Sequence, residues 1–272
     1  MIDIFEILKE QALRKTAHFK DEDFTIRGLW KVDLAFRPNP DERTFRYNFL
    51  VAQTVGQGSC YCDKQLEINE GLLGRDAREI ISEMSCYEIA LLDSIYASIP
   101  RTPQQVFELR GNSGEKAVTR GAIIVDEVER VLTRMTDVPG NISVVNVGVV
   151  GNLIKALKDK GYNVRATDLD EKIIGKSIHG VTIEDGTKTF QSVRDADLAV
   201  ITGMTLTTDA LNDIVHICQE NKTRLVMFAE TGANFGEEYC RTIGVDVVVS
   251  EPFPFYIFQG VTRIEIYRRD LA

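Results

Sequence analysis

Glycines and acids that follow apolar segments are the residues of this chain best suited to bind a ligand and do chemistry. Gly148 lies in the mainly apolar segment 144–150 and Gly151 directly follows it, and Asp168 and Asp170 follow 20 and 22 residues after Gly148. A glycine turn between a strand and a helix exposes backbone N–H groups, and an acid at the end of the next strand accepts hydrogen bonds from ribose hydroxyls. The pattern predicts a nucleotide site formed by Gly148, Val149, Val150, Gly151, Asn152, Asp168 and Leu169.

The same turn leaves the identity of the nucleotide open. It carries two glycines and departs from the full G-x-G-x-x-G pattern, which weakens the case for a bound pyrophosphate. The spacing to Asp168 suits S-adenosylmethionine as well as a dinucleotide, since both present an adenosine ribose. An α/β sheet also needs glycines where a helix packs closely on a strand, so a purely structural turn is the alternative.

Two further loops follow apolar segments and are expected to open on the same crevice. Glu230 follows the segment 224–229, where burial can raise the pKa of a carboxyl group into the range useful for proton transfer. The alternative is a carboxylate that caps a helix or pairs with Arg224 or Arg241. The candidate residues of these loops are Thr202, Gly203, Met204, Thr205, Glu230 and Thr231, while Thr208 is expected to cap a helix that begins at Asp209.

An aromatic segment and two thiols complete the candidates. Residues 251–256 read Glu-Pro-Phe-Pro-Phe-Tyr and could either stack a flat ring or pack against the first half of the chain. Cys60 and Cys62 lie two apart, so in a strand they share a face and could share a soft metal. Two half-buried thiols without a metal are the alternative, and we predict no metal site.

Alternating strands and helices position the loops of the second half. Mainly apolar strands are expected at 143–150, 163–167, 198–202, 224–229 and 246–250, with helices at 153–160, 209–220 and 235–243. This alternation predicts a Rossmann-like, doubly wound parallel sheet. The segment 262–268 alternates in polarity and is expected to add an edge strand.

The first half has the period-two pattern of antiparallel strands. Alternation over 26–36, 45–51 and 60–68 predicts a three-stranded meander, followed by helices at 75–84 and 87–97. A polar loop at 111–116 and a connecting helix at 123–135 come next. We therefore expect an α+β domain at 1–115, a connecting segment at 116–140 that ends near Gly140, and a nucleotide-binding domain at 141–272.

Composition narrows the range of partners. The 272 residues carry a net charge of −9, which disfavours nonspecific binding to nucleic acid or an anionic membrane. No apolar run reaches the roughly 20 residues of a membrane helix, and the first residues lack a signal peptide pattern. We expect a cytoplasmic protein that binds small molecules and forms a homo-oligomer.

Several of these segments resemble known families. In the turn at 147–151 and the segment 199–206, the chain resembles the heavy-metal chelation family, whose members combine an enolase-amino-terminal-like domain with a Rossmann-like one. Over most of its length the chain also resembles the archaeal methyltransferases of iron-guanylylpyridinol cofactor biosynthesis, and the segments 228–234 and 250–256 carry this second resemblance. That second resemblance implies S-adenosylmethionine as methyl donor and a pyridinol ring carbon as acceptor, in the making of an [Fe]-hydrogenase cofactor.

On that reading Asp168 holds the donor's ribose, Thr202 and Thr205 order water or ring substituents, and Glu230 assists deprotonation of the acceptor. Two other functions stay open. A nicotinamide-dependent oxidoreductase would use the same turn for NAD. A noncatalytic protein that binds metal or a small molecule would use Cys60 and Cys62.

Overall fold

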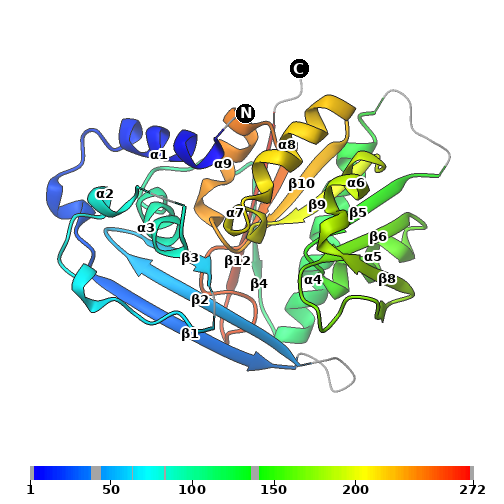
Figure 1. The fold of residues 1–272 in the computed structure, drawn as a ribbon, viewed down its shortest axis with the longest axis horizontal. Coiled ribbons are helices and arrows are strands. Elements are labelled where there is room, and N and C mark those ends of the chain that lie inside the picture. The colour runs from blue at the N-terminus through cyan, green and yellow to red at the C-terminus, as the bar shows by residue number, and fades with distance from the viewer. Residues whose placement is uncertain (1–2, 38–43, 63, 83, 136–140, 270–272) are drawn as a thin grey trace.

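The computed structural model describes residues 3–37, 44–62, 64–82, 84–135 and 141–269. Within these residues the chain forms a three-stranded and a nine-stranded sheet, which lie side by side (Figure 1). The strands are β1 (Gly28–Phe36), β2 (Phe45–Gln53), β3 (Gln57–Tyr61), β4 (Gln105–Leu109), β5 (Ser143–Val147), β6 (Asn163–Asp168), β7 (Ser177–Ile178), β8 (Val181–Asp185), β9 (Leu198–Thr202), β10 (Arg224–Ala229), β11 (Val247–Ser250) and β12 (Thr262–Arg268). The α-helices are α1 (Ile4–Lys15), α2 (Ala77–Ile80), α3 (Cys86–Tyr96), α4 (Ser113–Leu132), α5 (Gly151–Asp159), α6 (Thr189–Arg194), α7 (Met204–Thr207), α8 (Ala210–Asn221) and α9 (Gly236–Glu238). The short turns are η1 (Asp21–Phe24), η2 (Glu70–Leu72), η3 (Gly186–Lys188), η4 (Ala233–Phe235) and the π-helical η5 (Tyr239–Ile243).

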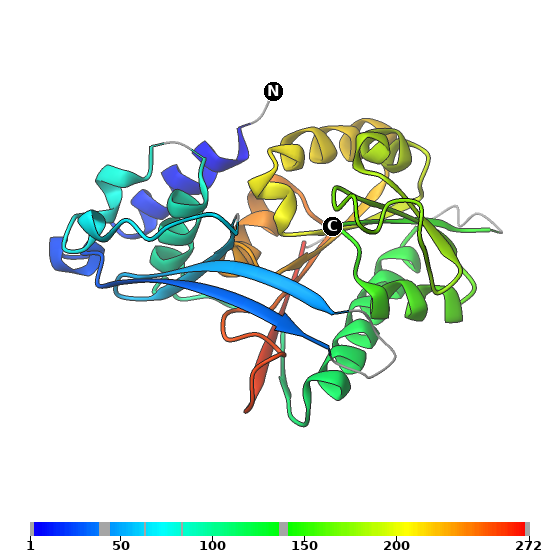
Figure 2. The ribbon, with the colours of Figure 1, turned by 60° about the horizontal axis from the view of Figure 1, so that its bottom comes forward.

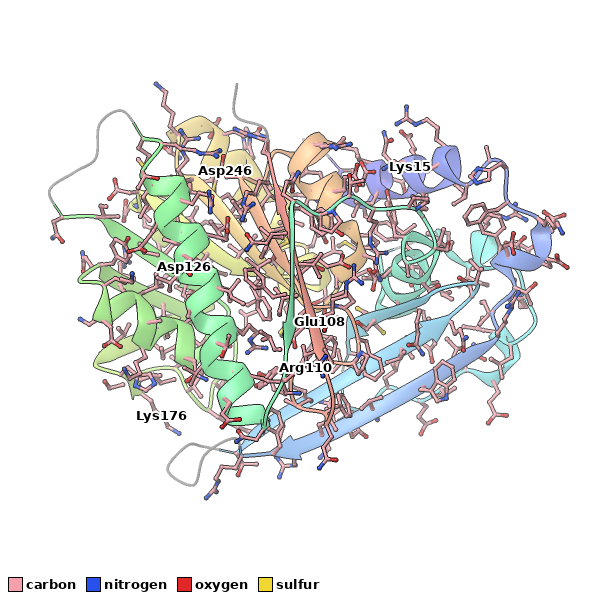
Figure 3. All side chains as sticks on the ribbon, turned by 180° about the vertical axis from the view of Figure 1, so that it is seen from behind. Lys15, Glu108, Arg110, Asp126, Lys176 and Asp246 are labelled. Atoms are coloured by element: carbon pink, nitrogen blue, oxygen red, sulfur yellow. The ribbon has the colours of Figure 1, made fainter. Side chains whose placement is uncertain are left out.

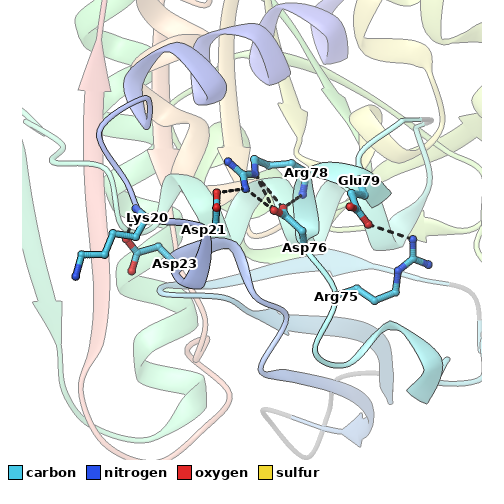
Figure 4. Close-up of polar contacts among 7 residues, drawn as sticks. All are labelled: Lys20, Asp21, Asp23, Arg75, Asp76, Arg78 and Glu79. Carbon is cyan, nitrogen blue, oxygen red and sulfur yellow. Dashed lines mark hydrogen bonds and ion pairs between the residues drawn. The ribbon is translucent and has the colours of Figure 1, made fainter.

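The first half forms the predicted antiparallel meander, in the order β1-β2-β3. Its third strand, Gln57–Tyr61, overlaps the strand expected at 60–68 only at Cys60 and Tyr61, and α2 covers only part of the helix expected at 75–84. Its inner face presents Leu50, Ala52 and Cys60, which pack in one core with buried residues of α3. Arg78 of α2 binds Asp76 and Asp21, so a small ion-pair network ties η1 to α2 (Figure 4). The fold class expected for this half is therefore confirmed.

The second half forms the predicted doubly wound sheet, in the order β4-β12-β11-β10-β9-β5-β6-β8-β7. Strands β6, β5, β9, β10 and β11 run parallel to their neighbours in this order. Their side chains alternate between two cores: Val145, Val147, Ala199 and Ile201 face the helix α8, whereas Val144, Leu198 and Val200 face α4 and α5. Helices on both faces explain why these strands are apolar without alternation.

The last strand differs from the expectation. β12 lies inside the sheet, between β11 and β4, and is not an edge strand. β4 forms the edge instead, and Figure 3 shows it next to α4, with Glu108 and Arg110 near its end. These charges suit an exposed edge because they discourage pairing with another chain.

The helix α4 begins ten residues before the helix expected at 123–135. Asn112 caps it: the Asn112 side chain accepts from Glu115 N at 3.0 Å, and the Glu115 carboxylate accepts from Asn112 N at 3.0 Å. This reciprocal capping box makes a helix of the segment that we expected to be a polar loop. The expected boundary at Gly140 lies outside the described residues.

The two halves share a core. Residues of α1, α3 and the meander belong to the same apolar cluster as one face of the large sheet. On the other side of the meander, Phe49 packs with Phe255, Tyr256 and Ala117, and Figure 2 shows the β1–β2 hairpin reaching toward α4. In the part of the chain that the structure describes, no helix combines the length and apolar character needed to cross a bilayer.

Candidate functional site

The site lies where the direction of winding changes in the large sheet. After β5 the chain adds β6 on one side, and it later adds β9, β10 and β11 on the other. In open α/β sheets ligands bind beyond the carboxyl ends of the strands at such a switch point. Gly148 follows β5 and Thr202 ends β9, so these two residues lie together at the switch point, where the floor of the crevice is expected.

Gly148 is required at this floor for two reasons. Its φ of +78° lies in the left-handed region that favours glycine, and a Cβ there would lie 2.5 Å from Thr202 Oγ1. The Gly148 N–H donates to Thr167 O at 3.0 Å, which fixes the turn against β6. The predicted glycine turn is therefore a closely packed part of the crevice.

Side chains accept hydrogen bonds from the next two N–H groups of the turn. Val149 N donates to Asp168 Oδ2 at 2.7 Å, and Val150 N donates to Asn146 Oδ1 at 3.1 Å. Asp168 Oδ1 accepts from Asp170 N at 2.8 Å. The Asp168 carboxylate thus bonds a backbone N–H just before α5, and its oxygens keep lone pairs that can accept further hydrogen bonds.

Gly151 and Leu169 lie close to this carboxylate in the chain. A Cβ on Gly151 would have Ile178 Cγ2, at 3.9 Å, as its nearest neighbour outside its own helix, and α5 begins without a side-chain cap. Leu169 is 64% exposed. The cofactor-binding roles expected for Gly151, Asn152 and Leu169 stay predictions.

Threonine side chains of the loop after β9 bond to the backbone of the same loop. Gly203 is needed because a Cβ would lie 2.4 Å from Thr231 O. Thr205 is buried and donates to Thr202 O at 2.9 Å, while Met204 O accepts from Thr207 Oγ1 at 2.8 Å. The structure leaves Thr202 as the half-buried hydroxyl at the crevice floor, and the roles expected for Thr202 and Thr205 stay predictions.

The expected cap of α8 is wrong. Thr208 Oγ1 lies 3.5 Å from Met204 O and 3.4 Å from Thr205 O, so it faces back toward α7. Asp209 precedes α8 with a φ of 55° and makes no capping bond with its side chain. A threonine in a short helical turn often bonds a carbonyl three or four residues earlier instead of capping the next helix.

Glu230 lies at the end of β10 in a buried ionic cluster. Arg120 Nη1 of α4 donates to Glu230 Oε1 and to Glu251 Oε2, each at 2.9 Å. The Arg120 guanidinium stacks between the rings of Tyr256, at 3.9 Å, and Phe228, at 4.6 Å. Glu251 is fully buried, whereas 15% of the Glu230 side chain is exposed.

This environment raises the pKa of Glu230 to about 8. Burial is the largest cause, and the neighbouring Glu251 adds to it, whereas Arg120 opposes both effects. The alternative partners considered from the sequence are occupied elsewhere, because Arg224 pairs with Asp246 and Arg241 with Glu237. Glu230 is thus an acid whose charge can change near neutral pH.

The loop that carries Glu230 is fixed to the meander. Ser59 Oγ donates to Glu230 O at 3.1 Å, and Thr231 Oγ1 accepts from Tyr61 N at 2.9 Å. Asp93 of α3 accepts from Ser59 N and Asn234 N, both at 2.8 Å, and burial raises its pKa to about 7. Thr231, predicted to contact the cofactor, therefore makes a bond that joins the two halves.

The aromatic segment packs against the meander. The rings of Phe255 and Phe49 lie 4.6 Å apart, and Tyr256 lies 6.1 Å from Phe36. Of the two roles considered from the sequence, the structure favours an internal interface. Its position also places Tyr256 against Arg120.

An open surface groove lies close to the loops after β9 and β3. Its volume is about 460 Å³. It is lined by Asn48, Tyr61, Cys62, Lys64, Cys86 and Thr207. The groove thus lies between the end of β3 and the loop that follows β9.

The thiols of the first half lie together on the face covered by α3. Cys60 and Cys62 are buried, and burial, with Cys86 and Cys62 nearby, raises the pKa of Cys60 well above its usual value. Among the described residues, no group of three or more His, Cys, Asp or Glu side chains is arranged to hold a metal ion.

Arg120 and Asn146 were not identified from the sequence. Arg120 lies on the buried stripe of α4 that includes Ala117, Ile124 and Val128. An arginine in an apolar stripe is a signal of a buried partner, because arginine is almost never fully buried unless it is paired. The sequence offered that signal, but it did not show which carboxylates would meet it.

Comparisons with known proteins agree with this architecture. Residues 131–231 match the model of the DUF364 family, whose description is "Putative heavy-metal chelation". No curated protein matches the chain.

Two solved structures of that family share the fold. A protein of unknown function from Pyrococcus horikoshii is 9% identical, with a TM-score of 0.62 over 98% of this chain and 100% of its own. A second, from Desulfitobacterium hafniense, is 11% identical, with a TM-score of 0.53 over 97% of this chain and 100% of its own. At these identities the similarity concerns the fold alone.

Proposed function

We propose that this protein is an S-adenosylmethionine-dependent methyltransferase that acts on a flat, pyridinol-type small molecule. The observation that carries the proposal is the carboxylate in the glycine turn. Asp168 accepts from Val149 N at 2.7 Å, so a carboxylate lies beside the N-terminus of α5, where the pyrophosphate of a dinucleotide would bind. A negative charge at this position repels a phosphate group, but it is compatible with a nucleoside that has no phosphate.

The donor's charge also favours this reading. S-adenosylmethionine has a cationic sulfonium, and the Asp168 carboxylate lies beside the glycine turn. When bound, the donor supplies an electrophilic methyl group to the acceptor. In this arrangement Asp168 accepts hydrogen bonds from the ribose hydroxyls, and Leu169 contacts the adenine ring.

Glu230 is placed to accept the acceptor's proton. β10 is two strands from β5, so its end lies about 10 Å from the glycine turn, at a spacing of ~4.8 Å per strand. Methyl transfer to a ring carbon breaks the sulfur–methyl bond, forms a carbon–carbon bond and releases the ring proton. The ionised form of Glu230 takes that proton, and the groove beside Tyr61 gives the acceptor room.

A direct test uses S-adenosylmethionine with a deuterium-labelled methyl group and a panel of hydroxypyridines. Mass spectrometry should find the label on a ring carbon with the wild-type protein. A Glu230→Gln protein serves as the matched control and should transfer far less label. Label transfer at equal rates by both proteins would remove Glu230 from the reaction.

A second candidate is a protein that binds a soft metal through its thiols. Its basis is the pair of buried thiols Cys60 and Cys62, which lie close enough to affect each other's charge; among the described residues, no group of three or more possible ligands is arranged around them. Metal stoichiometry that falls when Cys60 and Cys62 are both replaced by serine would support this function. Unchanged stoichiometry would reject it.

A further inference from the structure

The cluster of Glu230, Arg120 and Glu251 contains two carboxyl groups but only one guanidinium group. Arg120 Nη1 lies 2.9 Å from an oxygen of each carboxylate, and arginine does not give up its proton in proteins. With both carboxylates ionised, the cluster has a net charge of −1. Burying a net charge is costly, so uptake of one proton is favoured.

The other groups that face the cluster do not supply a second ion pair. Tyr256 and Tyr47 surround Arg120, and Lys116 lies on the side of Glu251. Lys116 Nζ donates to Phe258 O at 2.6 Å and to Gly260 O and Thr262 Oγ1, both at 3.2 Å. Among the described residues, Lys116 forms no close ion pair with either glutamate, and its charge interacts with Glu251 over a longer distance.

The two carboxylates are not equivalent. Glu251 accepts from Arg120 through one oxygen and from the backbone N–H of Tyr256 through the other, so both oxygens are bonded as in an ionised carboxylate. Glu230 accepts from Arg120 through Oε1, and its side chain is the one with exposed surface. The proton is therefore expected on Glu230, the member that a bound molecule can reach.

We propose that Glu230 and Glu251 hold a single exchangeable proton around Arg120, and that Glu251 is a positioning residue that sets how readily Glu230 takes a proton from the acceptor. The second half of this proposal rests on the proposed methyl transfer, while the first half does not. Glu251 acts by its charge and by holding Arg120 between the rings of Tyr256 and Phe228.

The first half is tested by NMR on protein labelled with ¹³C at the glutamate carboxyl carbons, which excludes signals from Asp93. In the wild-type protein one glutamate should titrate with a midpoint of about 8. In Glu251→Gln, the loss of a neighbouring negative charge should lower that midpoint by about one unit or more. The midpoint should not change in the control Glu184→Gln, which alters a glutamate paired with Arg165 outside the site.

Two results would overturn the proposal: a wild-type protein in which every glutamate titrates below about pH 6, or a midpoint that Glu251→Gln leaves in place. If Glu251→Gln fails to fold, Glu230→Gln decides, since it should remove the high titration altogether. Persistence of that titration in Glu230→Gln would also overturn the proposal.

The second half is tested by the pH profile of kcat/KM for methyl transfer. In Glu251→Gln the rising limb should move to lower pH, whereas a merely structural role would lower kcat without moving the limb. The two proposals can fail separately. Failure to bind S-adenosylhomocysteine rejects the methyltransferase and leaves the NMR result intact, while a low glutamate midpoint with good donor binding rejects only the shared proton.

Discussion

Two carboxylates at strand ends have different properties because their surroundings differ. Asp168 is half-buried and accepts from two backbone N–H groups, which suits an ionised group that binds hydroxyls. Glu230 is buried beside a second glutamate, and its pKa is raised to about 8. Residue type alone does not separate these roles, whereas burial and partners do.

Replacement of Glu230 by glutamine should lower methyl transfer by about 10²–10⁴-fold, the usual contribution of a general base. Donor affinity should stay close to that of the wild-type protein, because Glu230 lies two strands away from the turn. Rates from the labelled-methyl assay and affinities from calorimetry check both expectations. Equal losses of rate and affinity would show that Glu230 is structural.

Gly148→Ala should prevent donor binding and destabilise the fold by about 1–3 kcal/mol, because it adds backbone strain and a contact of 2.5 Å with Thr202 Oγ1. Gly161→Ala is the matched control: its φ is +85°, but a Cβ there meets nothing within 4 Å. The control should lose stability from strain alone and bind donor normally. Denaturant unfolding and calorimetry on both proteins provide the test, and equal donor affinities would contradict the account.

Among the helices and strands, the sequence predicted the bounds of several strands, which depend on local sequence patterns. The strands β9, β10 and β12 have the expected bounds, because their apolar content and flanking turns are local signals. The position of β12 inside the sheet was not predicted, since it depends on pairing with β4, which is about 155 residues away in the sequence. Glu230 was identified by its place after a buried strand, but its partner Arg120 comes from a helix 110 residues earlier.

The capping box of α4 is a testable element. Asn112→Ala should lower the free energy of unfolding by about 1 kcal/mol, because it leaves the backbone N–H of Glu115 without its acceptor. Ser85→Ala is the control, since Ser85 precedes α3 but makes no capping bond with its side chain. Urea unfolding should show a clear difference between the two variants. A loss in Ser85→Ala as large as that in Asn112→Ala would contradict the assigned cap.

For the whole molecule, buried acids predict how stability depends on pH. Asp93 and Glu230 have folded-state pKa values of about 7 and about 8, above those of the unfolded chain. The native state then binds more protons between about pH 4 and pH 8, so the free energy of unfolding should fall as pH rises through this range. Each group contributes at most about 1.4 kcal/mol per pH unit.

Urea unfolding at about pH 5 and pH 8 measures this effect. Acids with lowered pKa values, such as Asp76 and Glu184, act mainly below this range. Glu230→Gln should flatten the dependence. Stability that rises steadily from pH 5 to pH 8 would contradict the assigned environments of both acids.

Calorimetric titration with S-adenosylhomocysteine, with NAD in parallel, tests whether the turn at Gly148 binds a nucleoside without phosphate. We expect saturable binding of S-adenosylhomocysteine that Asp168→Ala weakens, and no measurable binding of NAD. Binding of NAD alone would contradict the account and assign the crevice to a dinucleotide.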